Sequence, residues 1–247
     1  MLPVRVRFHA QLNDFLPEVR RNAPIELPLK RRASVKDVIE AQGVPHPEVG
    51  LILVNGKSVD FSYIVRDGDQ IGVYPSFTTV HMDDIAPQDT PEPRFVLDSH
   101  LGRLAGHLRM LGFDTLYRND YDDRTLARVS ADEGRILLTR DRGLLKRSIV
   151  TQGYYVRETD HERQVVEVVA RFDMRGQIRP FLRCLRCNGL LVPASKEDIL
   201  DRLEPLTREY FHEFRICSGC GRIYCKGSHH KRMEVLIGRL FQGRDWG

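Results

Sequence analysis

The chain has 247 residues, of which 41% are apolar, and a formal net charge of +4. This length suits one large domain or two small ones, and the composition is that of an ordinary soluble protein. No apolar run approaches the roughly 18 residues that a membrane-spanning helix needs, and the first residues lack the pattern of a secretory signal. We therefore expect a cytoplasmic protein without a membrane partner.

The charge is unevenly distributed along the chain. Residues 1–90 hold 10 Lys/Arg against 12 Asp/Glu, whereas residues 91–247 hold 28 against 22. The excess of positive charge in the second part favours a polyanionic partner, with a solvated basic face as the alternative.

The amino-terminal part shows an ordered series of strand and helix patterns. Residues 4–10 and 25–29 alternate between apolar and polar side chains, which predicts two strands of a hairpin. Ser34 is a suitable N-cap for a helix that ends at Gly43. Two further strands are predicted at residues 51–54 and 70–74, so the predicted order is ββαββ.

This first block resembles the ubiquitin-like β-grasp domains, in particular the sulfur-carrier subfamily. The resemblance is carried by residues 34–39, 54–56 and 67–71 and implies a domain over residues 1–80. Sulfur carriers end in a free Gly-Gly tail, whereas this chain continues, and Gly-Gly occurs nowhere in it. We therefore expect a binding or scaffolding module with a protein partner. The alternatives are an appendix without separate activity and a sulfur-transfer adaptor.

A polar, acidic and proline-bearing stretch separates this block from the rest and predicts a linker over residues 81–93. After it, apolar runs at residues 95–97, 113–117, 136–138 and 154–156 alternate with helix patterns. This alternation is typical of a parallel sheet covered on both faces, here over residues 94–177. The apolar stripe of the first helix consists of Leu101, Leu104, Ala105, Leu108 and Leu111.

Two of these strands end in an aspartate where a helix pattern begins. Asp98 follows the first strand, Asp141 follows the third, and Asp122 and Asp123 open the helix between them. Because ligands bind at the carboxyl ends of parallel strands, these acids are expected to converge on one divalent cation for phosphodiester chemistry. The alternative is that each acid only caps a helix.

All five cysteines lie in the last quarter of the chain, and four of them form two C-x-x-C pairs. Such pairs are typical of tetrahedral zinc in a closed structural site, and they indicate a reducing compartment rather than disulfides. Free thiols or a redox pair are the alternatives. We expect Cys225 to be an unliganded thiol. The four predicted ligands, within a segment spanning residues 178–247, are Cys184, Cys187, Cys217 and Cys220.

The second part of the chain resembles the Mut-seven C-terminal RNase domain family. The resemblance is carried by residues 95–98, 101–105, 108–115 and 135–144, followed by the two cysteine pairs. It implies a PIN-like nuclease fold followed by a zinc ribbon. It also implies that Mg²⁺ or Mn²⁺ is bound by Asp98, Asp141 and one acid of the Asp122-Asp123 pair, for which we choose Asp123, with Asp120 or Asp160 as a further ligand.

Basic and aromatic residues near these features are candidates for binding RNA. Arg103, Arg140 and Arg142 lie beside two of the acids, and the ribbon contributes Tyr224, Lys226, His229 and Arg232. Plain surface charge is the alternative for the arginines. The sequence thus predicts a metal-dependent ribonuclease. The rival is a non-catalytic protein that binds RNA, tRNA or the ribosome.

Overall fold

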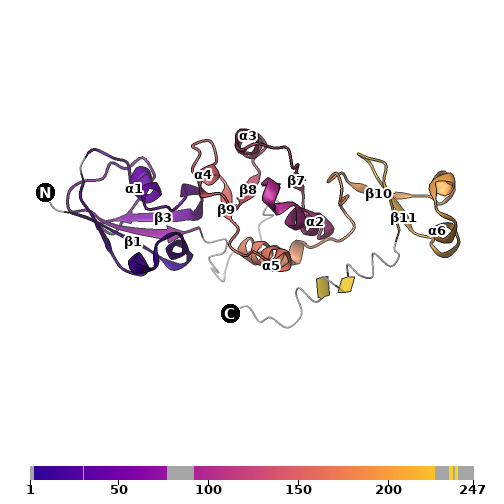
Figure 1. Cartoon of the computed structure of the whole chain (residues 1–247), viewed down its shortest axis with the longest axis horizontal. Coiled ribbons are helices and arrows are strands. Elements are labelled where there is room, and N and C mark those ends of the chain that lie inside the picture. Colours follow the sequence, from indigo (N-terminus) through magenta and orange to yellow (C-terminus); the bar gives the residue numbers. More distant parts are fainter. Residues whose placement is uncertain (1–2, 30, 77–91, 226–233, 236, 239–247) are drawn as a thin grey trace. The chain divides into compact units, whose positions relative to one another are not determined.

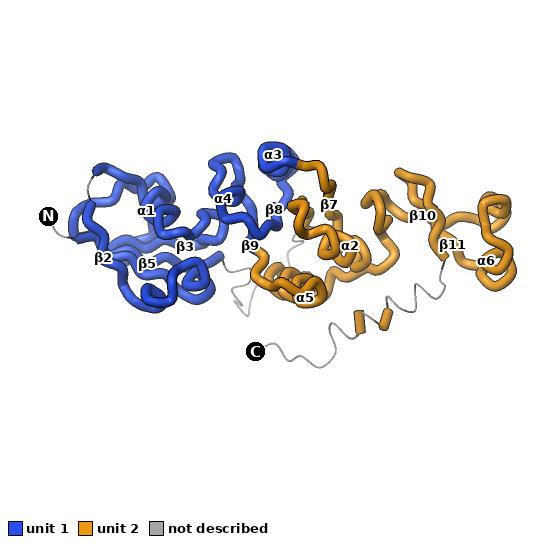
Figure 2. Tube along the Cα trace, in the orientation of Figure 1, with its two compact units in different colours: residues 1–86, 122–155 blue, residues 87–121, 156–247 orange. Residues whose placement is uncertain are grey.

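A computed structural model gives the structure of the chain and describes residues 3–29, 31–76, 92–225, 234–235 and 237–238. The chain separates into two compact units, one formed by residues 1–86 and 122–155 and the other by residues 87–121 and 156–247 (Figure 2). No helix in the described ranges is long and apolar enough to cross a membrane. The predicted division at residues 80, 93 and 177 stays a prediction, and most of the predicted linker lies outside the described residues.

The first unit begins with a mixed five-stranded sheet. Its strands are β1 (Val4–Phe8), β2 (Ile25–Leu27), β3 (Val49–Val54), β4 (Lys57–Val59) and β5 (Gln70–Pro75). They are arranged in the order β2-β1-β5-β3-β4 (Figure 1), with β1 and β5 parallel and the other pairs antiparallel. Val4, Val6 and Phe8 of β1 are buried because alternate residues of a strand share one face.

Helix α1 (Val35–Ala41) starts at the predicted N-cap. The Ser34 hydroxyl accepts a hydrogen bond from the Asp37 N–H at 3.1 Å, and the Asp37 carboxylate accepts one from the Ser34 N–H at 3.2 Å. The hydroxyl and backbone N–H of Ser34, which both donate to Asp37, lower the pKa of that carboxyl. This reciprocal pair is a capping box. The helix then buries Val35 and Ile39 against the sheet in a β-grasp arrangement.

One strand of the sheet was not predicted. β4 has three residues and only one apolar side chain, so it carries no alternating pattern. Asn55 and Gly56, with φ of 51° and 81°, form the two-residue turn that returns the chain beside β3. The observed order is therefore ββαβββ rather than ββαββ.

The first unit also contains four elements from the middle of the chain: α3 (Asp123–Glu133), β8 (Ile136–Thr139), α4 (Arg142–Leu145) and β9 (Gly153–Tyr155). β8 and β9 are parallel, and both helices lie against β8. Gly134 ends α3 with φ of 60°, a backbone conformation in which a Cβ is strained. The predicted alternation of helices and strands is confirmed for this segment.

The second unit holds the other half of the predicted nuclease segment. Its elements are β6 (Phe95–Leu97), the 3-10 turn η4 (Ser99–Leu101), α2 (Gly102–Met110), β7 (Thr115–Tyr117), α5 (His161–Arg171) and the 3-10 turn η5 (Arg175–Gln177). β6 and β7 are parallel, and α2 packs against α5 and β7. The predicted apolar stripe is confirmed, since all five of its side chains are buried.

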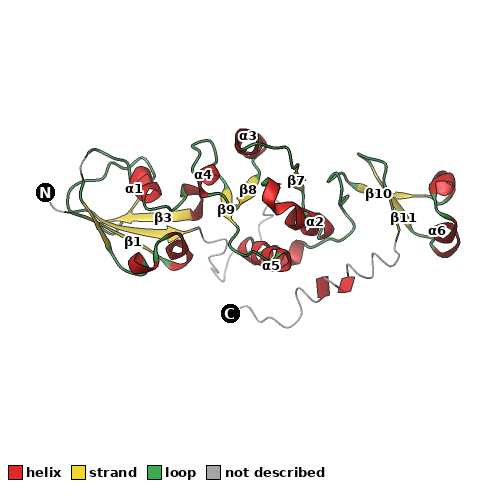
Figure 3. Cartoon of the chain, viewed as in Figure 1, coloured by secondary structure: helices red, strands yellow, loops and turns green. Residues whose placement is uncertain are grey.

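The carboxyl-terminal part of this unit is a small antiparallel sheet with short helical turns (Figure 3). It consists of β10 (Leu191–Ala194), η6 (Glu197–Arg202), α6 (Pro205–Tyr210), β11 (Phe214–Cys217) and β12 (Ile223–Cys225). Between the cysteine pairs lies η6, a 3-10 helix. A compact core of Ile199, Leu203 and Phe214 supports the sheet.

Gly112, just after α2, lies against the backbone of Arg179, and a substitution there tests this close packing. It has φ of 101°, and an added Cβ would overlap the carbonyl oxygen of Arg179. Gly112→Ala should therefore lower the free energy of unfolding by roughly 2 kcal/mol or more. In the matched control Gly106→Ala, within α2, the new Cβ meets nothing within 4 Å. It should leave stability unchanged or raise it by about 1 kcal/mol. Urea denaturation followed by circular dichroism measures both, and equal stability of Gly112→Ala and the wild type would contradict the packing.

Candidate metal sites

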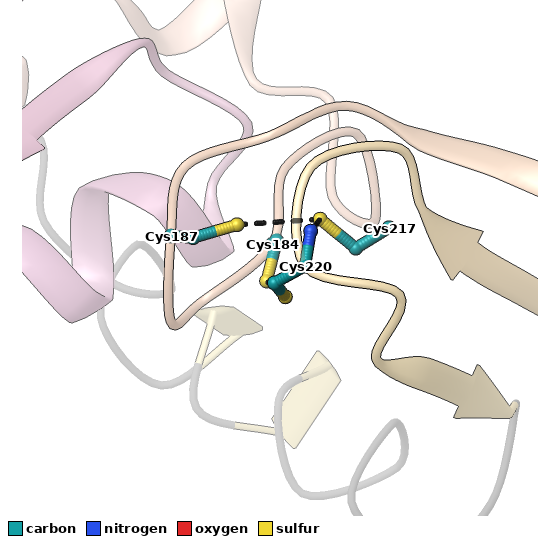
Figure 4. Close-up of side chains that lie close together, drawn as sticks. All are labelled: Cys184, Cys187, Cys217 and Cys220. Atoms are coloured by element: carbon teal, nitrogen blue, oxygen red, sulfur yellow. Dashed lines mark hydrogen bonds between the residues drawn. The ribbon is translucent and has the colours of Figure 1, made fainter.

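The four predicted zinc ligands lie together in the second unit (Figure 4). Their sulfur atoms are all within 4.8 Å of one another. The Sγ atoms of Cys184 and Cys220 are 3.7 Å apart, and those of Cys187 and Cys217 are 3.3 Å apart. Tetrahedral zinc with Zn–S bonds of about 2.3 Å requires sulfurs about 3.8 Å apart, so the spacing fits a single ion.

The backbone around the sulfurs is shaped for this spacing. The N–H groups of Gly219 and Cys220 both point at Cys217 Sγ, at 3.4 Å. At Gly189 an added Cβ would lie 2.9 Å from Cys217 Sγ and 3.4 Å from Cys187 Sγ. Any larger residue would therefore push into the space between the two cysteine turns, which explains the glycine after the first pair.

The crowding of the thiols changes their acidity. Burial raises the pKa of Cys184, but hydrogen bonds from Tyr224 and from the backbone of Cys187 and Arg186 outweigh it and lower the pKa to about 6. Burial together with the neighbouring thiols raises the pKa of Cys187 to about 12, despite a hydrogen bond from Gly189. Four sulfurs this close ionise together only when a cation neutralises them. The donor set is thus suited to a soft divalent metal such as zinc.

Tyr224 supports the cluster from β12. Its hydroxyl lies 3.0 Å from Cys184 Sγ and accepts a hydrogen bond from the Leu185 N–H at 3.1 Å, so its proton is directed at the sulfur. Burial, and then the contact with Cys184, raise the pKa of Tyr224. Such a hydrogen bond to a ligand atom fixes the orientation of the ligand. Cys225 lies apart from the four sulfurs and packs against the core around Phe214.

Two buried polar residues, neither of them a predicted site residue, fasten the first cysteine turn to the α2–β7 region. The Arg109 guanidinium donates to the carbonyls of Leu185 and Arg186 at 3.1 and 3.0 Å, and to that of Thr115 at 2.9 Å. Asn188 accepts from the Thr115 N–H at 3.0 Å through Oδ1. Burial lowers the pKa of Arg109, although the nearby cysteines oppose this. The Arg109 guanidinium therefore lies close enough to Cys184 and Cys187 to be stabilised by the negative charge of a metal–thiolate cluster.

Asp98 differs from an ordinary helix cap. It follows β6 and precedes η4, yet its side chain makes no capping hydrogen bond to that turn. The side chain accepts a hydrogen bond from the Ser99 hydroxyl at 3.1 Å, and the residue is 6% exposed. A buried carboxylate must be compensated by hydrogen bonds or positive charge. The capping alternative is therefore not supported for Asp98.

Asp141 and Asp122 do cap helices. Asp141 Oδ1 accepts hydrogen bonds from the N–H groups of Gly143 at 2.6 Å and Leu144 at 3.3 Å, at the start of α4. Asp122 Oδ1 accepts from the Thr125 N–H at 2.7 Å, and hydrogen bonds from the side chain and backbone of Thr125 lower the pKa of Asp122. The capping alternative is thus realised at both positions, and a metal-binding role would have to use the remaining carboxylate oxygen.

Asp123 and the further candidates have other contacts. Asp123 is exposed on the first turn of α3, and its carboxylate lies 3.6 Å from the Arg147 guanidinium. Asp120 is exposed and pairs with Arg118 through two hydrogen bonds of 2.8 and 2.7 Å. Asp160 caps α5.

Convergence of the acids stays a prediction. Asp98 belongs to one compact unit, and Asp123 and Asp141 belong to the other. In the described part of the chain, the four cysteines form the single group of three or more His, Cys, Asp or Glu residues whose ligand atoms lie within 4.8 Å of one another.

The predicted RNA-binding residues have different surroundings. Arg103 is exposed on α2, and Arg140 is half-buried and engaged by other groups. Arg142 donates from Nη1 to the Phe15 carbonyl at 3.1 Å, so its guanidinium is already used within the first unit. Tyr224 contacts the cysteine cluster. The remaining three, Lys226, His229 and Arg232, lie outside the described residues.

Comparisons with known proteins agree with the order of domains. A family model described as "Mut7-C ubiquitin" matches residues 1–81, and one described as "Mut7-C RNAse domain" matches residues 93–237. A search of curated proteins found no match. Among solved structures, a Pyrococcus furiosus protein provisionally described as molybdopterin converting factor, subunit 1, is 23% identical. The alignment covers 30% of this chain and 98% of that one, with a TM-score of 0.24.

The RNase-domain match spans more than half of the 247 residues and contains both the predicted carboxylates and the cysteine cluster. The amino-terminal match corresponds to the β-grasp sheet. The chain therefore belongs to the Mut7-C RNAse domain family, with a ubiquitin-like domain in front.

Proposed function

We propose that the protein is a metal-dependent ribonuclease that hydrolyses RNA phosphodiester bonds. Asp98 carries the proposal. It is a buried carboxylate at the carboxyl end of β6, inside the segment that matches the RNase-domain family, and it does not cap the turn that follows. In open parallel sheets, ligands bind at the carboxyl ends of the strands, which is where Asp98 lies.

Three carboxylates would hold the catalytic cation. Asp98, Asp123 and Asp141 offer only oxygen ligands, which suit Mg²⁺ and Mn²⁺ better than softer metals. Both capping hydrogen bonds to Asp141 use Oδ1, so binding through Oδ2 is compatible with the cap. A divalent cation at such a site supplies Lewis acidity that activates water and neutralises charge on the leaving oxygen.

Basic side chains would hold the substrate backbone. Arg103 lies five residues after Asp98, and Arg140 directly precedes Asp141, so both are close in sequence to the proposed cation site. The excess of positive charge after residue 90 agrees with a polyanionic substrate. The proposed ribbon contacts through Tyr224, Lys226, His229 and Arg232 would add to this. The proposed substrate class is RNA, including tRNA and ribosome-associated RNA.

The cysteine cluster is proposed to hold a structural zinc ion. Two of its cysteines are buried, and the geometry offers four protein ligands. The first turn is held in place by hydrogen bonds that Arg109 donates and by one that Asn188 accepts from the Thr115 N–H. A closed four-cysteine site leaves no position for a substrate. Zinc would thus stabilise the ribbon rather than take part in hydrolysis.

A non-catalytic RNA-binding protein is the second candidate function. It is favoured by one observation, namely that Asp141 and Asp122 cap α4 and α3. If capping were the whole role of these acids, the basic second part of the chain would bind RNA without cleaving it. Mutagenesis separates the two functions because an asparagine still caps a helix but is a weak metal ligand.

The first prediction from the proposed function concerns catalysis. Asp98→Asn and Asp141→Asn should each reduce Mn²⁺-dependent cleavage of a single-stranded RNA by about 100-fold or more, because a charged ligand to the cation is lost. The affinity for uncleaved RNA should stay within about twofold. Asp132→Asn, an exposed acid on α3, is the control and should cleave like the wild type. Unchanged cleavage in the Asp98→Asn, Asp141→Asn double variant would contradict a catalytic role for these acids and leave RNA binding as the proposed function of this segment.

The second prediction separates the acidic pair. Asp123→Asn should lower cleavage strongly, whereas Asp122→Asn should retain both cleavage and stability, because asparagine replaces aspartate as a cap at little cost. Thermal unfolding and a cleavage assay on both variants provide the comparison. The opposite pattern, with Asp122→Asn inactive and Asp123→Asn active, would assign the ligand to Asp122.

The third prediction concerns zinc. The purified chain should contain about one zinc per molecule by elemental mass spectrometry, as a four-thiolate site requires. Cys184→Ser should lose most of this zinc and the folded ribbon. Cys225→Ser should keep the metal, since Cys225 is outside the four-sulfur group. A Cys184→Ser protein with undiminished zinc would refute the site.

A further inference from the structure

The β-grasp domain is fastened to the loop that carries Asp141. Within the first unit, side chains or backbone groups of the two segments meet at four points spread over α4, the loop after it and the end of β9. We call these four hydrogen bonds the clamp. The four pairs are Arg142 with Phe15, Lys146 with Glu40, His46 with Val150, and Glu48 with Tyr155.

Arg142, the first residue of α4, makes the most extensive contact. Its Nη1 donates to the carbonyl of Phe15, the last residue of the 3-10 helix η1 (Ala10–Phe15), at 3.1 Å. Its guanidinium carbon lies 5.1 Å from the centre of the Phe15 ring and 5.4 Å from that of Tyr155. The two rings meet edge to face with centroids 5.4 Å apart. A planar cation that contacts two aromatic rings is held in both position and orientation.

Lys146 follows the last residue of α4 and anchors the other end. Its Nζ donates to the carbonyl of Glu40 at 2.7 Å. Glu40 lies in the last turn of α1, where the helix dipole favours a cation, and its carbonyl also accepts a hydrogen bond from the Gly43 N–H at 3.0 Å. Both ends of the four-residue helix α4 are thus tied to the β-grasp domain.

Two buried residues of the β-grasp domain extend the clamp beyond α4. His46 Nε2 donates to the Val150 carbonyl at 2.7 Å, and its Nδ1 faces the Glu40 carboxylate at 2.7 Å. Glu48, which is 1% exposed, accepts a hydrogen bond from the Tyr155 N–H at 2.6 Å. Both residues lie in the 3-10 turn η3 (His46–Glu48). Because they are buried and bonded across the interface, the two segments pack as one body.

The clamp matters because α4 is too short to hold its own shape. A single helical turn is unstable in isolation and depends on packing and anchoring. Asp141 is bonded to the first N–H groups of this turn through Oδ1, and its own N–H donates to the Thr139 hydroxyl at 2.9 Å. The direction of the Asp141 carboxylate is therefore set by where α4 lies.

We propose that the β-grasp domain positions Asp141 for cation binding by clamping α4, with Arg142 and Lys146 as positioning residues. This proposal rests on the proposed function insofar as Asp141 is a metal ligand. It assigns Arg142 a different role from the RNA contact expected from the sequence, since the guanidinium is bound to Phe15 and flanked by two rings.

Amide hydrogen exchange on the full-length protein tests the clamp independently of activity. In the double variant Arg142→Met, Lys146→Met, the amides of residues 141–147 should exchange at least about tenfold faster, because two anchors of α4 are lost. Arg142→Lys, Lys146→Arg keeps a donor at each position but loses the planar guanidinium at residue 142, so its exchange should be faster than in the wild type and slower than in the double methionine variant. Lys57→Met, at an exposed position of β4, is the control. Unchanged exchange at residues 141–147 in the double methionine variant would overturn the proposal.

Steady-state cleavage kinetics then separate positioning from RNA binding. Misplacing a metal ligand should lower kcat by about tenfold or more with little change in KM. The Arg142→Lys, Lys146→Arg variant should recover part of the lost kcat. A raised KM with unchanged kcat would instead assign these residues to RNA binding and would refute positioning. If the wild type cleaves no RNA, the proposed function fails, and the exchange experiment alone decides whether the clamp orders α4.

Discussion

Negative side chains that are held close together need a cation, and this electrostatic constraint connects the cysteine cluster with the proposed carboxylate site. At the cysteine cluster the constraint is visible directly, because four sulfurs lie within 4.8 Å and perturb one another's acidity. At the strand ends it is the basis of a proposal, in which Asp98 and Asp141 share a divalent ion. The ligand types differ, and so should the metals: thiolates favour zinc, and carboxylates favour Mg²⁺ or Mn²⁺.

The accessory parts of the chain are each fastened to the nuclease segment by buried polar residues. In the second unit Arg109 and Asn188 hold the first cysteine turn against α2 and β7. In the first unit His46 and Glu48 hold the β-grasp domain against the region after β8. Such groups are costly to bury unless each finds its partner, so they fix the position of the parts they join. The β-grasp domain thus contributes to the order of the nuclease segment and need not have a sulfur-transfer role.

The sequence predicted the features that have a local signature. Spacing identified the four cysteines, the residues after Ser34 identified the capping box, and apolar runs ending in acids located β6 and β8. Features without local periodicity were missed. β4 is too short to show an alternation of apolar and polar residues. In the sequence, Arg109 looks like an exposed basic residue of α2, whereas in the structure it is buried. Arg142 and the Phe15 carbonyl are 127 positions apart, and no pattern near Arg142 reveals that contact. The expectation that Arg142 binds RNA rests on its position beside Asp141 in the sequence. That position does not determine the direction of the Arg142 side chain.

The central claim is that acids remote in sequence share one divalent cation. An experimental structure of the zinc-loaded chain soaked in Mn²⁺, with anomalous scattering recorded at the manganese and zinc edges, tests this most directly. The account predicts a manganese peak within bonding distance of carboxylate oxygens of both Asp98 and Asp141, in addition to a zinc peak among the four cysteines. A zinc peak without manganese, with the two carboxyl groups too far apart to bind one ion or a bridged pair, would contradict it.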